Sequence, residues 1–233
     1  MAAFTLRESK MQPNYYLDIR ILDSADDGEL SLAHIRNQIY NIVHGVFRKM
    51  PEKFALALEM SPRQQRKMQM KEAKYNYPIT PNYDVLRIFA SEQIDLDQLV
   101  ENIKGHWKIR DYAVLNHPVA VPIAKLTGWR CYFRFRLPTL KAEPKFLKNY
   151  PERESLHTKR LSKAKKLPYF KVISQSTGQG FTVPIEIFDI NFEGENFGLP
   201  ENYKDVKVLK SGLPDGYGLA RKQQAFALPV FEV

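Results

Sequence analysis

The first residues that could do chemistry are two histidines, His34 and His44, on one predicted helix over residues 31–49. At about 100° per residue, both imidazoles point roughly 140° away from the centre of the apolar stripe of that helix. A histidine in such a place is commonly a plain surface side chain. Imidazole also titrates near neutral pH, so either ring could serve as a general base.

A second candidate is a dense polar block between two apolar segments, Ser174-Gln175-Ser176-Thr177-Gly178-Gln179. The block is typical of a hairpin turn, and its hydroxyls and amides could equally hold a ribose or a phosphate. Tyr217 lies between Gly216 and Gly218. Flanking glycines leave a ring open to a close ligand or partner, although a packed turn tyrosine fits the same pattern.

The sequence lacks the common ligand patterns of metal and cofactor sites. It has a single cysteine, Cys131, and neither a His-Glu-x-x-His motif nor a glycine-rich phosphate loop that ends in Lys-Ser/Thr. We therefore expect an enzyme of this sequence to work without metal or cofactor. One cysteine fits a reducing cytoplasm. No run approaches the ~20 apolar residues that span a bilayer, so we expect no membrane partner.

The positive charge of the chain is concentrated in one basic segment, residues 130–166. The segment holds 12 Lys or Arg and 3 acidic residues, an excess equal to the net +9 of the whole chain. The rest of the chain is neutral, with 23 basic and 23 acidic residues. Such a concentration indicates a polyanionic partner such as nucleic acid, although a solvated basic loop has a similar composition.

The basic segment begins with a strictly alternating stretch, which predicts a β-strand. One face would carry Trp129, Cys131, Phe133 and Phe135, which suit a core. The other face would carry guanidinium groups and one ring, which suit phosphates and stacked bases: Arg130, Tyr132, Arg134 and Arg136.

Further along the basic segment, Pro151 can open a helix that runs to about residue 165. Arg153, His157 and Arg160 would form one stripe on it, at i, i+4 and i+7. Its apolar positions are few, so we expect it to pack weakly and to order fully against a polyanion.

The order of predicted elements positions these groups. Strands are expected at 15–22, 54–58, 85–89 and 112–123, and helices at 31–49 and 96–103. This β-α-β-β-α-β order is the ferredoxin-like pattern within the α+β class. We predict a ferredoxin-like domain over 1–124. Residues 125–233 would form a C-terminal region with the basic helix and a β-hairpin, while 61–74 would be a long loop or short helix.

These segments together resemble the type I-F CRISPR repeat-processing endoribonuclease, the Csy-type hairpin nuclease. The matching stretches are residues 16–20, 174–179 with Phe181, and 217–219, with looser agreement at 85–91 and 118–122. Their order and approximate spacing are kept across almost the whole chain. Two departures are the mixed Lys, Arg and His content of the basic helix, where the family is dense in arginine, and the extra stretch at 61–74.

The resemblance implies metal-independent cleavage of pre-crRNA at the base of the repeat hairpin, by attack of a ribose 2′-hydroxyl. The protein would then stay on the crRNA, within the surveillance complex and beside other CRISPR proteins. His44, and not His34, aligns with the histidine of the family and would take the hydroxyl proton. Ser174 would hold that hydroxyl in line, and Tyr217 would orient the imidazole. Such a reaction needs positioning and a base.

The resemblance also assigns Phe181 to the base pair at the foot of the hairpin. The other predicted RNA contacts rest on the resemblance and on charge: Arg130, Arg134, Arg136, Arg153, His157, Arg160, Lys163, Ser176, Thr177 and Gln179. A non-catalytic subunit that binds the crRNA hairpin in the same complex is the alternative, and an unrelated basic RNA-binding protein is a more distant one. The presence of both His44 and Ser174 favours the enzyme.

Overall fold

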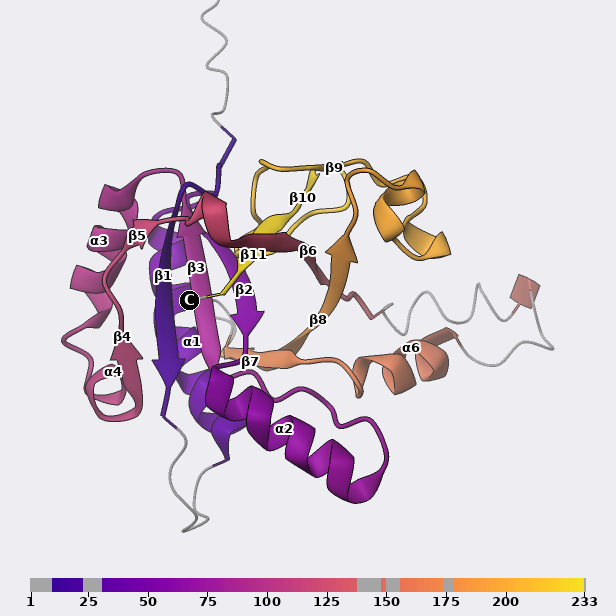
Figure 1. The fold of residues 1–233 in the computed structure, drawn as a ribbon, viewed down its shortest axis with the longest axis horizontal. Coiled ribbons are helices and arrows are strands. Elements are labelled where there is room, and N and C mark those ends of the chain that lie inside the picture. Colours follow the sequence, from indigo (N-terminus) through magenta and orange to yellow (C-terminus); the bar gives the residue numbers. More distant parts are fainter. Residues whose placement is uncertain (1–9, 23–30, 138–147, 150–155, 174–177, 233) are drawn as a thin grey trace, which may run out of the picture.

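The computed structural model describes residues 10–22, 31–137, 148–149, 156–173 and 178–232. Two antiparallel sheets and a set of helices confirm the predicted α+β class (Figure 1). The first sheet contains β1 (Tyr15–Ile21), β2 (Ala55–Glu59), β3 (Val85–Ala90), β4 (Ala113–Leu115) and β5 (Val119–Ala120). The helices are α1 (Leu32–Lys49), α2 (Pro62–Tyr75), α3 (Gln93–Ile103), α4 (Trp107–Tyr112) and α6 (Leu156–Ala164).

The strands of the first sheet follow the spatial order β2-β3-β1-β4, and β5 pairs with β1 beyond β4. All of these pairs are antiparallel. Helix α1 connects β1 to β2, and α3 with α4 connects β3 to β4. Both α1 and α3 contact β1 and each other, so they cover the same face of the sheet. The predicted continuous last strand is instead two short strands, because residues 116–118 interrupt the regular pairing with β1, although the Asn116 N–H still donates to the Asp18 carbonyl. The short helix η1 (Ile123–Lys125) follows.

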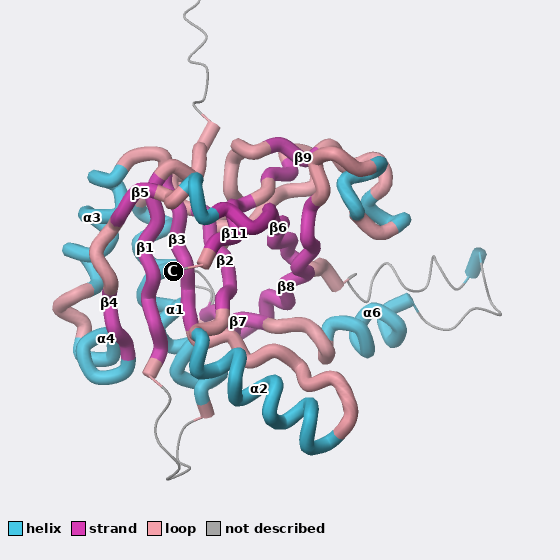
Figure 2. The backbone as a smooth tube through the Cα atoms, in the orientation of Figure 1, coloured by secondary structure: helices cyan, strands magenta, loops and turns pink. Residues whose placement is uncertain are grey.

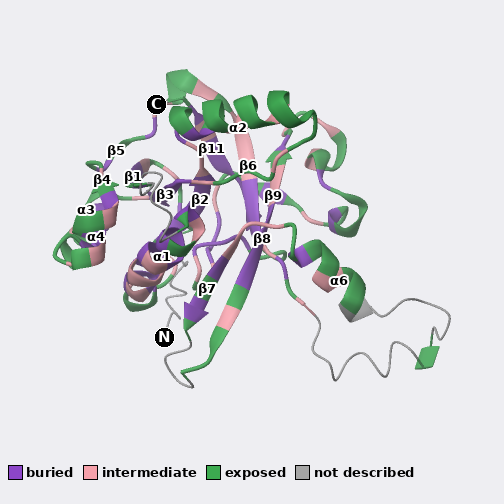
Figure 3. Cartoon of the chain, turned by 90° about the horizontal axis from the view of Figure 1, so that it is seen from below, coloured by how far each residue is buried: buried purple, intermediate pink, exposed green. Residues whose placement is uncertain are grey.

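Residues 61–74 form a full helix rather than a loop or short helix. Ser61 caps the start of α2 by accepting the Gln64 N–H, Pro62 lies in its first turn, and Asn76 ends it in the left-handed conformation. Its side chains are mostly exposed, as Figure 3 shows. A helix held by its caps and largely solvated has no apolar stripe, which is why hydrophobic periodicity does not predict it. Among the described residues, no helix combines the length and apolar character that membrane crossing requires.

The second sheet has the order β11-β6-β8-β7 and lies on the β2 side of the first (Figure 2). Its strands are β6 (Leu126–Arg134), β7 (Tyr169–Ile173), β8 (Gly180–Ile190) and β11 (Leu228–Phe231). The predicted hairpin is confirmed as β7 and β8, which pair from Tyr169 with Pro184 to Ile173 with Gly180. The remaining elements are short: η3 (Glu195–Gly198), η4 (Glu201–Tyr203) and the parallel pair β9 (Val208–Leu209) and β10 (Ala225–Phe226).

The two edges of the second sheet contact opposite sides of the first layer. Strand β7 packs on α1. On the other side, the Phe231 ring of β11 lies 4.8 Å from the Tyr16 ring of β1. One continuous core therefore joins both sheets. The predicted division at residue 124 falls between β5 and β6 and stays a prediction.

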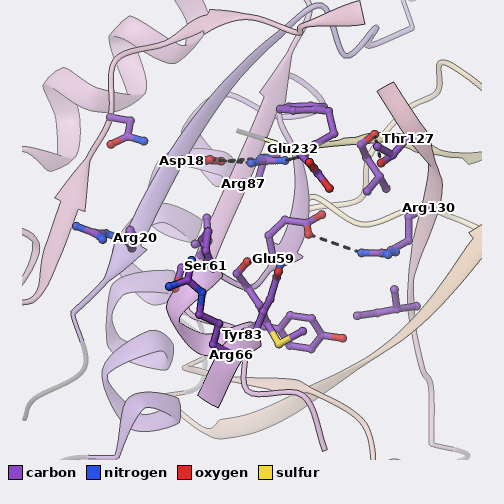
Figure 4. A pocket seen from close by; sticks show the side chains of 18 of the residues that line it. Asp18, Arg20, Glu59, Ser61, Arg66, Tyr83, Arg87, Thr127, Arg130 and Glu232 are labelled. Atoms are coloured by element: carbon purple, nitrogen blue, oxygen red, sulfur yellow. Dashed lines mark hydrogen bonds and ion pairs between the residues drawn. The ribbon is translucent and has the colours of Figure 1, made fainter. Parts of the chain in front are cut away.

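A buried ion pair lies where the sheets meet. The Arg87 guanidinium donates from Nε and Nη2 to the two Asp18 carboxylate oxygens, at 2.8 Å each (Figure 4). The two side chains are 6% and 8% exposed. The guanidinium also lies 4.2 Å from the centre of the Phe231 ring, so Arg87 links β3 to the second sheet.

We expect Asp18→Ala to lower the free energy of unfolding by about 3–5 kcal/mol, because it leaves a buried guanidinium without its counter-ion. Asp18→Ala with Arg87→Met should be less destabilised than Asp18→Ala alone, since the stranded charge is gone. Urea unfolding measures both. Glu101→Ala, which breaks the exposed Glu101–Lys104 pair, is the matched control and should cost less than about 1 kcal/mol. Equal losses for Asp18→Ala and Glu101→Ala would contradict the assignment.

Candidate active site

His44 lies in a row of four stacked aromatic rings. The Phe170 ring of β7 stacks on Tyr40 of α1, with centroids 3.6 Å apart. The imidazole of His44 follows one helical turn later, 5.7 Å from the Tyr40 ring. The Tyr217 ring stacks on the imidazole, with ring centroids 5.1 Å apart and ring planes inclined by 10°. The row fixes the plane of the imidazole.

The loop that carries Tyr217 is folded tightly onto α1 and β2. One carboxylate oxygen of Asp215 accepts the backbone N–H groups of both Tyr217 and Leu219, at 2.9 Å each. Gly218 has a φ of +79°, and a Cβ there would lie 2.8 Å from a Phe47 ring carbon. Only glycine fits this close approach without strain. The Tyr40 hydroxyl donates to the Tyr217 carbonyl at 3.1 Å, so the helix also holds the loop.

His44 is buried, which corrects the sequence-based placement of its side chain on the helix surface. Its exposed fraction is 8%, whereas His34 is exposed as predicted. The apolar stripe of α1 marks the face that packs on the first sheet. The face that holds His44 is covered by β7 and by the Tyr217 loop, which are more than 100 residues away along the chain. The apolar periodicity of a helix cannot predict that segments distant in sequence pack on its other face.

Burial keeps the imidazole neutral. Desolvation, together with the nearby charge of Arg48, lowers the pKa of His44 to about 4, although a hydrogen bond to the backbone of Gly216 raises it in part. That interaction raises the pKa because it favours the protonated ring. At neutral pH the imidazole is neutral, and one of its nitrogens keeps a lone pair that can accept a proton.

Cations and a further ring surround this row. The Arg134 guanidinium of β6 lies 4.9 Å from the centre of the Tyr217 ring. The Phe181 ring of β8 meets Tyr217 edge-on, with centroids 6.3 Å apart. Arg136, two residues beyond Arg134, is exposed. The structure thus brings four predicted site residues together in a chain of contacts: His44, Tyr217, Phe181 and Arg134.

The other predicted members of that strand face are engaged within the protein. Arg130 donates from Nε to Asp189 at 2.8 Å, and one of its terminal nitrogens lies 3.7 Å from a Glu59 oxygen. The Tyr132 ring, expected to be open to bases, is 2% exposed, and its hydroxyl donates to Glu59 at 3.2 Å. This face of β6 is covered because β2 packs opposite it. Arg130 also lines a cavity of about 1020 Å³ between the sheets, where acids match the arginines (Figure 4).

Helix α6 confirms the predicted basic helix over its described part, residues 156–164. The Arg160 guanidinium lies 4.6 Å from the centre of the Phe135 ring, and its Nε is buried without a hydrogen-bond partner. Lys163 donates to Glu186 of β8 at 2.5 Å while its side chain stays half exposed. Both residues therefore attach α6 to the second sheet.

Several predicted site residues lie outside the described residues. They are Ser174, Ser176, Thr177 and Arg153, and, for its side chain only, His157. Gln179 is described and is exposed at the start of β8. Within the described part of the chain, no three side chains of His, Cys, Asp or Glu gather as metal ligands.

Sequence reasoning missed Tyr40, Phe170 and Asp215. Tyr40 and His44 are four residues apart, the spacing at which helical side chains meet, so this pair was visible in the sequence. Asp215 precedes Gly216, and Asp-Gly is a turn signature that could have indicated the carboxylate as the organiser of the Tyr217 loop. Phe170 carried no such local indication, because it reaches the row through tertiary packing.

We expect the stability of the protein to fall between about pH 6.5 and pH 4 because of His44. Over that range the unfolded chain binds a proton that the folded protein does not, so acidification favours unfolding, by about 3 kcal/mol for a shift of this size. The measurement is urea unfolding at a series of pH values. His44→Gln removes the titrating group, so its free energy of unfolding should decline less steeply. Identical slopes would show that His44 titrates normally.

Comparison with known protein families identifies the family of this chain. A family model described as CRISPR-associated protein (Cas_Csy4) matches residues 16–199, which include His44, Arg134, Phe181 and both strands of the hairpin. A comparison with curated proteins finds no match. The family match spans most of the chain and confirms the resemblance drawn from its motifs: the chain belongs to the CRISPR-associated Cas_Csy4 family.

Proposed function

We propose that this protein is a metal-independent endoribonuclease of a type I-F CRISPR system. It binds the hairpin of the repeat RNA, cleaves pre-crRNA at the hairpin base, and stays on the crRNA as a subunit of the surveillance complex. The observation that carries the proposal is a buried, neutral imidazole, held between Tyr40 and Tyr217 in a member of this family.

In the proposed reaction His44 takes the proton from the ribose 2′-hydroxyl beside the scissile phosphate. The oxygen attacks phosphorus, and the bond to the 5′-oxygen of the next nucleotide breaks. That oxygen takes a proton from water and leaves as a 5′-hydroxyl, and a 2′,3′-cyclic phosphate remains on the hairpin. The environment of His44 supports a base, because burial keeps the imidazole neutral and a neutral imidazole has one nitrogen with a free lone pair. Tyr217 fixes the ring plane by stacking. Ser174, by resemblance, holds the hydroxyl in line.

The RNA stem is proposed to lie across α6 and the end of β6. Arg134, Arg136, Arg160 and Lys163 supply positive charge there, with Arg153, His157 and Gln179 as further proposed contacts, and Phe181 would stack at the foot of the stem. Ser176 and Thr177 would support the pocket. Arg130 has a different part in this proposal: its pairing with Asp189 and Glu59 joins β6 to its neighbours and leaves phosphate contact to Arg134 and Arg136.

We further propose that the first sheet, with α1 and α3, is a ferredoxin-like domain over residues 1–124. The antiparallel order β2-β3-β1-β4 and the two helices on one face support this. Residues 125–233 would then be the RNA-binding region.

The deciding experiment is single-turnover cleavage of the CRISPR repeat RNA encoded beside the gene, in excess chelator. We expect wild-type protein to cut and to leave a 2′,3′-cyclic or 3′-phosphate end. His44→Gln should cut about 10²–10⁴-fold more slowly, because a general base contributes that much, while its affinity for the RNA stays near wild type. A 2′-deoxyribose at the cleavage site should bind and resist cleavage, because it lacks the nucleophile.

The exposed His117 provides the matched control, and His117→Ala should cut normally. Cleavage by His44→Gln at the wild-type rate would contradict the assignment of the base. Strict dependence on magnesium would contradict the metal-independent reaction. If wild-type protein binds the hairpin and never cuts it, the non-catalytic alternative is correct.

A second prediction concerns the salt dependence of hairpin binding. Arg136→Ala should weaken binding and flatten the slope of log affinity against log salt by roughly one unit, because one phosphate contact is lost. Arg110→Ala, an exposed arginine on α4, is the control and should leave the slope unchanged. Fluorescence anisotropy over a salt series measures the slopes. An unchanged slope for both Arg134→Ala and Arg136→Ala would move the stem away from this surface.

A further inference from the structure

A second cavity, of about 600 Å³, lies between the first half of α1 and the β7–β8 hairpin. Its walls carry His34, Gln38 and Asn41 from the helix, and Lys171, Phe181 and Thr182 from the hairpin. Its volume is within the range of small-ligand sites. The proposed reaction uses only one of these residues, Phe181.

The floor of this cavity is fixed by side-chain amides. Asn41 Nδ2 donates to the Lys171 carbonyl at 2.7 Å and to the Asn37 carbonyl at 2.7 Å. The Lys171 N–H donates to Asn37 Oδ1 at 3.2 Å. These bonds hold α1 and β7 at a set separation, so the cavity exists before any ligand arrives.

The cavity walls carry side chains of the kinds that bind single-stranded RNA. Phe181 and Tyr169 are half-buried rings on which a base can stack. Gln38, in contact with His34, presents an amide for a base edge, and the exposed Lys171 presents a charge for a phosphate. Among the described residues that line the cavity, none is acidic, whereas acids line the larger cavity between the sheets.

The place of this cavity relative to His44 defines which part of an RNA could enter. Phe181 borders it and meets Tyr217, which stacks on His44. The Arg134 guanidinium lies over the Tyr217 ring. Phe135, the next residue, is in turn contacted by the cationic groups of Arg160 and Lys163. Tyr217 therefore contacts His44, the Arg134 guanidinium and Phe181 at the rim of the cavity. A strand that passes Tyr217 and His44 from a stem on the cations would reach the cavity along Phe181.

We propose that this cavity binds the unpaired nucleotides of the repeat RNA on the 3′ side of the cleaved bond. The proposal rests on the proposed function, because it takes the stem to lie on the cationic surface. The cavity would hold the RNA on the 3′ side of the cleaved bond while the cationic surface holds the stem. The phosphate beside His44 would then be held from both sides before cleavage.

The test compares hairpins that differ only beyond the stem. One ends at the cleavage site. A second continues on the 3′ side with a short unpaired extension, a third carries an unpaired extension on the 5′ side only, and all three carry a 2′-deoxyribose at the cleavage site. We expect the 3′ extension to tighten equilibrium binding by roughly 5- to 30-fold, which is the scale of one stacked base. The 5′ extension should have a much smaller effect.

Lys171→Ala and Gln38→Ala should each lower the ratio of the two affinities, with and without the 3′ extension, towards one. Lys125→Ala, an exposed lysine in η1, is the matched control and should keep the wild-type ratio. A wild-type ratio near one, a larger gain from the 5′ extension, or a ratio that both cavity variants leave unchanged would overturn the inference. Failure to bind even the hairpin that ends at the cleavage site would instead overturn the proposed function.

Discussion

The structure depends on the burial of both faces of α1. The face that carries Ile35, Ile39 and Val43 packs into the core shared with the first sheet. The other face is covered by β7 and the Tyr217 loop, which come from the second sheet and from the chain beyond it. This double cover removes water from His44, lowers its pKa and supplies the rings that fix its plane. Each half of the chain contributes to the environment of one imidazole.

Charge is arranged in two different ways within the molecule. Between the sheets, Arg87 and Arg130 are matched by Asp18, Glu59 and Asp189 at short range, and these residues join strands. Along the outer end of β6, on α6 and at the hairpin, positive groups have fewer acids near them. The second arrangement leaves positive charge, such as that of the exposed Arg136, available to a polyanion.

Most of the fold follows from local sequence patterns. The apolar stripe of residues 31–49 predicts α1, and alternation predicts β6. A polar turn between two apolar segments predicts the β7–β8 hairpin. The burial of His44 and Tyr132 could not be predicted, because the covers come from segments distant in sequence. Helix α2 was missed for another reason, since capping by Ser61 and Asn76 stabilises it without an apolar stripe. Of the candidate site, His44 and Tyr217 were predicted by resemblance, and local patterns could have indicated Tyr40 and Asp215, while Phe170 required the tertiary arrangement.

The amides of Asn37 and Asn41 have a consequence beyond the catalytic site. Strand β7 is the last strand of the second sheet, and such an edge ordinarily presents unpaired backbone groups on which a strand of another molecule can add. Here both backbone groups of Lys171 are already bonded to α1. At this position the outer edge of β7 therefore offers no backbone group to a strand of another molecule.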